Sequence, residues 1–203
     1  MLSPYNQEHL QTFQAARSVL DRMPEHETAS LRMKIQPYVD FRKEVASFQQ
    51  AVFSDVCTLK CYLDGTSACC AREGIMAFFA DVVVNTLLSS AEEIHALEQN
   101  LRCTLEGSRC VYLSEDGCLW HLKPIVCEMF LCDHAVAAKL ESDDSLRREW
   151  EIFQKREREF TWPDRPVLFD DLETFFLERG CESPLMYYHR SPGLLRVKAG
   201  WKA

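Results

Sequence analysis

The chain has 203 residues, 47% of them hydrophobic, and a formal net charge of −8 at pH 7. This length and composition suit one domain with its own hydrophobic core, so disulfides are not needed to replace a core. The acidic balance argues against a nucleic-acid partner, because phosphate binding needs a basic surface. The first residues lack the basic and apolar regions of a secretory signal, and no stretch is long and uncharged enough to span a bilayer. We therefore predict a cytoplasmic protein with reduced cysteines and no membrane contact.

Residues 1–55 follow a helical pattern. Ser3 is a candidate N-cap with Pro4 at the first helical position, and apolar residues recur at helical spacing as far as Leu20. A second helix is predicted to follow Pro37 and to run towards Cys57.

Residues 56–140 hold most of the cysteines and the longest apolar run. Residues 75–88 are apolar on nearly all sides, which predicts a buried central helix. Residues 110–113 and 118–120 flank an Asp-Gly pair, which favours a short β-hairpin. Such a hairpin would bring Cys110 and Cys118 together, with backbone N–H groups available to donate to their sulfurs.

Residues 141–203 are rich in charge. Residues 146–160 indicate a solvated helix, and residues 170–179 a short amphipathic helix that ends at Gly180. No repeat or linker marks a domain boundary. The prediction is a single, mainly α-helical domain of residues 1–203 with one short hairpin, whose acidic C-terminal helices are a possible surface for another protein.

The most informative feature is the crowding of cysteines, because nine of the ten lie between residues 57 and 132. Packing alone rarely clusters cysteines in this way, so we predict that the domain is organised around a cysteine-ligated metal centre. The candidate ligands are Cys57, Cys61, Cys69, Cys70, Cys110, Cys118, Cys127 and Cys132.

The spacings restrict which thiols can meet. Residues four apart on a helix share a face, so Cys57 and Cys61 can serve one site. Cys127 and Cys132 are five apart, so either a helix begins between them or they serve different sites. The adjacent residues 69 and 70 diverge, so they either reach different centres or one of them packs.

The second half of the cluster resembles a family of bacterial proteins described as zinc- or iron-chelating domains. Its signature combines Cys-x-x-Leu, Cys-x-Ile-Tyr, Arg-Pro-x-x-Cys and a closing Cys. The matching positions here are Cys110, Leu113, Cys118, Trp120, Lys123, Pro124, Cys127 and Cys132. The first half departs from the family pattern, because seven residues separate Cys61 from Cys69.

The resemblance implies an iron-sulfur cluster or zinc with a structural, redox or metal-sensing role. We favour iron-sulfur because the chain has no CxxC, the usual knuckle of four-cysteine zinc sites. The same signature resembles the cysteine domain of a flagellin lysine methylase, which implies a cluster-dependent protein-modifying transferase as the alternative. No phosphate-binding loop, HExxH, GxSxG or catalytic triad supports an enzyme.

The remaining cysteines and nearby histidines are interpreted more simply. We predict that Cys103 and Cys181 are small buried hydrophobes. His121 and His134 are interpreted as surface or outer-sphere residues, although His134 could complete a Cys3His site.

Four other residues flank the predicted centre. Trp120 and Pro124 are predicted to pack around it and to exclude water. Arg109 and Lys123 could offset the negative charge of a thiolate-bound centre, although solvated charges are the simpler interpretation.

Overall fold

The computed structural model describes residues 2–63, 70, 76–103 and 110–200. Within these ranges the chain is mainly helical, with one two-stranded antiparallel hairpin, as the sequence predicts. The first half contains α1 (Pro4–Leu20), α2 (Glu25–Ser54), η1 (Asp55–Tyr62), α3 (Phe79–Leu88) and α4 (Ala91–Arg102). The second half contains β1 (Leu113–Ser114), β2 (Gly117–Cys118), α5 (Ile125–Glu128), α6 (Asp133–Ala135), η4 (Val136–Leu140), α7 (Asp144–Thr161), α8 (Leu168–Leu177), α9 (Tyr187–Arg190) and α10 (Pro192–Gly200).

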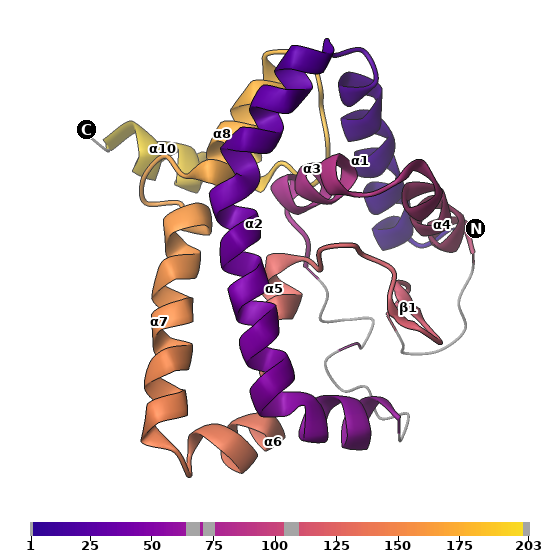
Figure 1. The fold of residues 1–203 in the computed structure, drawn as a ribbon. Coiled ribbons are helices and arrows are strands. Elements are labelled where there is room, and N and C mark those ends of the chain that lie inside the picture. The colour runs from indigo at the N-terminus through magenta and orange to yellow at the C-terminus, as the bar shows by residue number, and fades with distance from the viewer. Residues whose placement is uncertain (1, 64–69, 71–75, 104–109, 201–203) are drawn as a thin grey trace.

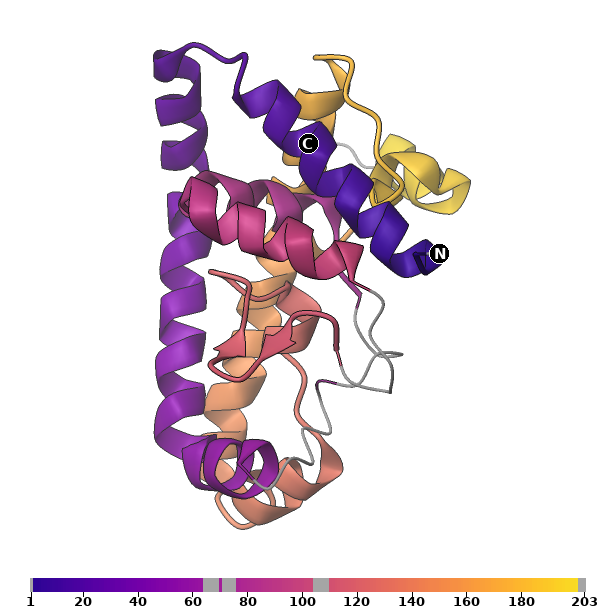
Figure 2. The same ribbon diagram turned by 90° about the vertical axis from the view of Figure 1, so that its right-hand side faces the viewer.

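Helix α2 spans the height of the molecule and organises the other elements around it (Figure 1). Helices α1, α3, α4 and α8 gather beside its N-terminal half, and α7 lies alongside its C-terminal half (Figures 1 and 2). At its lower end the chain turns into η1, which projects towards the side where the hairpin lies. The hairpin, η1 and α5 therefore lie on one side of α2, and these elements carry four of the candidate thiols, while Cys110 lies three residues before β1.

The N-terminal helix begins as predicted, but the second helix does not. The Ser3 side chain accepts the Asn6 N–H at 3.1 Å, and Pro4 opens α1. The prediction that the second helix follows Pro37 is wrong, because α2 begins at Glu25 and contains Pro37. A buried stripe runs through this point, with Ile35 1% and Tyr38 0% exposed, so packing outweighs the missing proline N–H.

The buried central helix is confirmed as α3, although it starts at Phe79 rather than at residue 75. Its side chains are buried on nearly every side, because α1 and α8 pack against it. One cluster of buried apolar side chains extends from α1 through α3 to α8 and draws on all three parts of the chain.

The charged C-terminal helices also match their predictions in outline. Helix α7 is solvated on most sides but places Trp150 and Phe153 against Phe48 of α2, with ring centroids 6.0 and 5.3 Å away. Helix α8 is followed by Gly180, whose positive φ of 72° lets the chain reverse after the helix. Among the described residues, no helix combines the length and apolar character that a bilayer span requires.

Candidate metal centre

The hairpin holds its two cysteines as the sequence predicts, although its strands are only two residues long. Leu113 pairs with Cys118, and Gly117 adopts a positive φ of 112° at the turn. The Tyr112 N–H donates to Cys110 Sγ at 3.4 Å, and the Trp120 N–H donates to the Cys118 thiol. Each of the two hairpin sulfurs therefore receives a backbone N–H, which stabilises a thiolate and is typical of a metal ligand.

The environment of Cys118 keeps its thiol neutral in the metal-free protein. Its side chain is exposed, yet loss of hydration to the surrounding protein raises the pKa of the thiol. The Trp120 N–H and the Lys123 ammonium act in the opposite direction and lower this pKa. Lys123 therefore acts electrostatically on a candidate ligand, while its side chain remains about half exposed at 48%, as the simpler interpretation of a solvated charge expects.

A third thiol, Cys127 of α5, shares the environment of the hairpin thiols. Burial raises the pKa of Tyr5, and the charges of Cys110, Cys127 and Cys118 raise it further. The pKa of Tyr112 is also raised first by burial, with contributions from Tyr5 and the same three cysteines. Electrostatic influence of this kind falls off with distance, so each of the three thiols lies in the neighbourhood of these two tyrosines.

Four aromatic side chains lie near these thiols and pack on one another, and we call them the aromatic wall: Tyr5, His9, Tyr112 and Trp120. The rings of Tyr5 and His9 stack with centroids 4.0 Å apart, and His9 Nδ1 hydrogen-bonds the Tyr112 hydroxyl at 2.6 Å. Trp120 is 4% exposed and packs edge-on against Tyr112, which confirms its predicted packing role. Sequence reasoning missed Tyr5 and His9. Their only signal is that they lie four residues apart on one face of a helix.

The first cysteine cluster meets the second at α5. Cys57 and Cys127 both line a pocket of about 420 Å³ between the end of α2, η1 and α5. η1 is a π-helix, in which the Leu63 N–H bonds the Thr58 carbonyl at 3.1 Å, and such segments often occur at functional sites. Cys61 also lies on η1 but is not among the described residues that line the pocket.

A backbone contact brings the adjacent-cysteine segment to the hairpin. The Cys110 N–H donates to the Cys70 carbonyl at 2.7 Å. Cys70 is half-buried against the core. Cys69 and Arg109, both singled out from the sequence, lie outside the described residues.

No helix begins between Cys127 and Cys132, a stretch that the structure describes in full, so the first of the two predicted alternatives is wrong, and the use of the two thiols in different sites stays a prediction. Cys127 lies on α5, which ends at Glu128, whereas Cys132 is the N-cap of α6. His134 follows on α6 and is exposed. His121 is also exposed and pairs with Glu93 at 3.2 Å, as expected of a surface histidine.

The predictions for the two remaining cysteines have different outcomes. Cys181 is 5% exposed, which confirms it as a buried hydrophobe. The same prediction for Cys103 is wrong, because α4 ends at Arg102 and leaves Cys103 exposed as its C-cap. The Cys103 thiol donates to the Gln99 carbonyl at 3.4 Å.

Arg42 of α2 supports the segment that carries Cys127. Its guanidinium is 1% exposed and donates to the Tyr38 hydroxyl and the Lys123 carbonyl, each at 2.7 Å. It also pairs with the buried Glu128 carboxylate at 3.4 Å. The arginine therefore fixes both ends of the Lys123 to Glu128 segment from a neighbouring helix.

Helix α3 holds the same segment from the other side. The buried Asp81 carboxylate accepts the N–H groups of Phe78 and Ile125, each at 3.0 Å. Asn85 Oδ1 accepts the Leu122 N–H at 3.0 Å. Burial raises the pKa of Asp81 to about 6, although both N–H donors and Arg42 favour the charged form. The backbone from Leu122 to Ile125 is thus set by α3, and Pro124, which is buried as predicted, continues this support.

The chemistry of the donor set fits a soft metal. Three thiols lie near the same two tyrosines, two of these thiols receive backbone N–H donors, and a lysine lies near one of them. Within the parts of the chain that the structure describes, no three His, Cys, Asp or Glu side chains stand close enough together to hold an ion. The described residues therefore supply suitable donors without a complete coordination shell.

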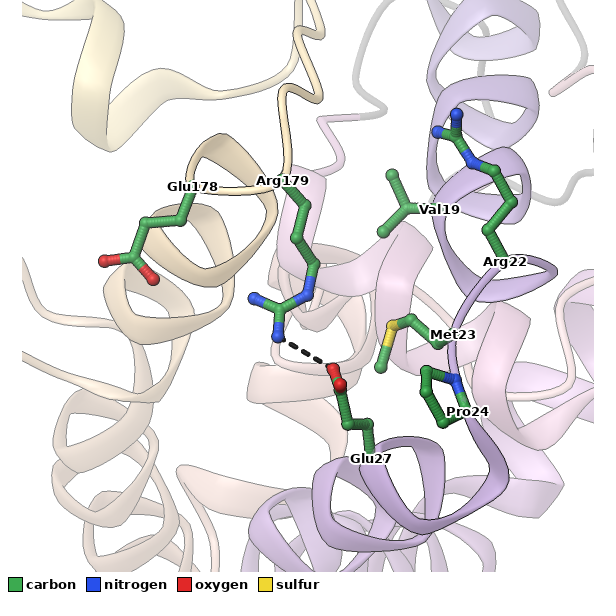
Figure 3. A pocket seen from close by; sticks show the side chains of 7 residues that line it. All are labelled: Val19, Arg22, Met23, Pro24, Glu27, Glu178 and Arg179. Carbon is green, nitrogen blue, oxygen red and sulfur yellow. Dashed lines mark hydrogen bonds and ion pairs between the residues drawn. The ribbon is translucent and has the colours of Figure 1, made fainter.

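A second pocket, of about 580 Å³, lies between the α1–α2 turn and the end of α8 and has a different character. Figure 3 shows the Arg179 guanidinium reaching across it to the Glu27 carboxylate, at 2.8 Å, while Arg22 and Glu178 point away from it. None of its described lining residues is a cysteine. The Arg179–Glu27 ion pair spans this pocket, whose described lining shares no residue with the pocket that Cys57 and Cys127 line.

The buried histidine of the aromatic wall predicts a pH dependence of stability. Burial lowers the pKa of His9 to about 4, from about 6.5 in the unfolded chain. Between these values the unfolded state binds the extra proton, so stability is full above pH 6.5 and falls as the pH drops towards 4. The His9 contribution lost should be about 3 kcal/mol. We expect a His9→Gln variant to lose this dependence, as measured by urea unfolding across the range.

The wild type must be compared with the His9→Gln variant, because the titration of Asp81 changes the stability in the opposite direction as the pH falls. Its raised pKa stabilises the fold at low pH and loses that contribution as the pH rises through about 6. The difference between wild type and His9→Gln removes the Asp81 contribution, which both proteins share. A difference that stays constant from pH 7 to pH 4 would contradict the buried, neutral His9.

We found no match to this chain among protein-family models, curated proteins or solved structures.

Proposed function

We propose that this protein is a metal-binding protein that holds an iron-sulfur cluster or a zinc ion through its clustered cysteines. The observations that support this most directly are the backbone N–H groups that donate to Cys110 and Cys118 and the place of Cys127 near the same two tyrosines. These thiols come from a hairpin and a separate helix, and buried polar groups outside the cluster fix their backbone. Cysteines that only fill space in a core do not need such hydrogen-bonded support, whereas metal ligands usually have it.

Cys110, Cys118 and Cys127 are proposed as the central ligands. Cys57 is the next candidate because it lines the same pocket as Cys127. The other candidates from the sequence are Cys61, Cys69, Cys70 and Cys132, of which Cys70 contacts the hairpin through its carbonyl. Bound metal would supply either electron transfer, as a cluster, or a structural crosslink, as zinc.

An iron-sulfur cluster remains the favoured occupant. The chain has no CxxC, and the candidate ligands come from separated segments, a pattern that clusters tolerate. Backbone N–H groups that donate to the sulfurs are also a means by which proteins tune cluster potentials. The proposal places the protein in a reducing compartment such as the cytoplasm, where the thiols stay available.

The proposal is tested by metal and acid-labile sulfide analysis of protein purified without oxygen, together with its visible spectrum. Iron with equimolar sulfide and broad visible absorption would establish a cluster. Colourless protein with stoichiometric zinc would establish the structural alternative. Protein that contains neither, and that takes up neither Zn²⁺ nor reconstituted iron and sulfide, would refute the proposal.

A further inference from the structure

The Tyr5 hydroxyl is a buried polar group that lacks a hydrogen-bond partner among the described residues. Its oxygen has essentially no solvent contact, so water does not replace the missing partner. Leaving such a group unsatisfied costs free energy, and native proteins rarely do so without a reason. The hydroxyl therefore calls for an acceptor that the described residues do not provide.

The surroundings of Tyr5 indicate where that acceptor lies. Its ring is held by stacking on His9, and His9 is bonded to Tyr112. The Tyr112 backbone donates to Cys110 Sγ at 3.4 Å. This series of contacts connects the tyrosine ring to the hairpin thiols. The Trp120 indole N–H, a second buried donor without a partner among the described residues, packs on the other side of Tyr112.

We infer that the Tyr5 hydroxyl donates a hydrogen bond to a sulfur of the metal centre and is a positioning residue for that centre. The inference rests on the proposed metal-binding function and adds a group from outside the cysteine-rich segment. A thiolate bound to a metal keeps lone pairs that accept hydrogen bonds, and a charge-assisted bond of this kind is stronger than a neutral one.

Donation by Tyr5 is favoured over ligation through its oxygen. A phenol ordinarily loses its proton only near pH 10, so the hydroxyl is a donor at neutral pH. Its role would match that of the Tyr112 and Trp120 backbone N–H groups, which already donate to Cys110 and Cys118. The sulfurs would then receive donors from both the backbone and α1.

Tyr5→Phe tests this inference because it removes one oxygen and keeps the ring. The probe is Co²⁺, titrated into reduced apoprotein without oxygen and followed by its thiolate-to-cobalt absorption. We expect Tyr5→Phe to bind Co²⁺ about tenfold more weakly, as one lost hydrogen bond to a charged sulfur would cause. The apoprotein should unfold at the same temperature as wild type or higher, since the removed hydroxyl has no partner among the described residues.

Tyr187→Phe is the matched control. Tyr187 lies near enough to Tyr5 to influence its pKa, but the pKa of Tyr187 is raised by burial and by Glu8, with no cysteine among the causes. Its Co²⁺ affinity should stay within about twofold of wild type.

The outcomes separate this inference from the proposed function. Wild-type affinity in Tyr5→Phe, or a destabilised Tyr5→Phe apoprotein, would overturn the role of the hydroxyl and leave metal binding intact. Failure of wild-type protein to develop thiolate-to-cobalt absorption would overturn both.

Discussion

Replacing Cys127 with serine is expected to remove the bound metal and to lower the melting temperature of the purified protein to that of the apoprotein. Serine keeps the size of cysteine but replaces a soft thiolate with a hydroxyl, which soft metals bind poorly. Ligand binding to the folded state alone stabilises it, so losing a metal held at a thousand times its dissociation constant removes about 4 kcal/mol. For a chain of this length that corresponds to about 10 °C, measurable by differential scanning calorimetry with parallel metal analysis.

Cys103→Ser is the control for this experiment. Cys103 is exposed, and its thiol donates to a carbonyl of its own helix. The control should retain the metal and melt within about 1 °C of wild type, as surface substitutions usually do. If Cys127→Ser kept its metal and its melting temperature, Cys127 would not be a ligand.

Replacing Arg42 with methionine should destabilise the protein by about 3–5 kcal/mol, the usual cost of breaking a buried ion pair from one side. Methionine fills most of the space, but it leaves the Glu128 carboxylate, which is 5% exposed, without its closest cation. The Lys123 carbonyl and the Tyr38 hydroxyl also lose a donor. Urea unfolding at pH 7 measures the change in the free energy of unfolding.

A second substitution separates the buried charge from the lost packing. Adding Glu128→Gln to Arg42→Met removes the unpaired carboxylate and should recover at least about 1 kcal/mol. Arg147→Met is the surface control, because Arg147 pairs with Asp144 while half exposed, and its cost should be below about 1 kcal/mol. Equal effects of Arg42→Met and Arg147→Met would show that the Arg42 network does not hold the fold.

Local signals in the sequence were sufficient for much of the helical framework. The Ser3 cap, the hairpin turn at Gly117 and the reversal at Gly180 all depend on residues next to one another, and each was predicted. The start of α2 was not, because Pro37 is a strong local breaker. The buried residues Ile35 and Tyr38 on either side of it pack into one core, an effect that no local rule includes.

In the candidate site, too, local sequence patterns predicted some features, whereas others depend on the tertiary fold. The sequence identified the cysteines and the hairpin that holds Cys110 and Cys118, because those patterns are local. It did not identify Tyr5, whose place beside the thiols depends on how α1 packs against the hairpin. It also missed Arg42, which contacts Glu128 across 86 residues of sequence. Long-range pairs of this kind need the tertiary fold before they can be recognised.

The contacts that hold the Cys127 segment also indicate whether the chain folds before or after it binds metal. Arg42 and Asp81 hold the residues on both sides of Cys127 through carboxylate, guanidinium and amide groups. No thiol takes part in these contacts. The central thiols thus reach their shared environment through contacts that need no metal. We therefore expect the chain to fold first and to receive its metal afterwards, so that a delivery system would act on a folded acceptor rather than on a nascent chain.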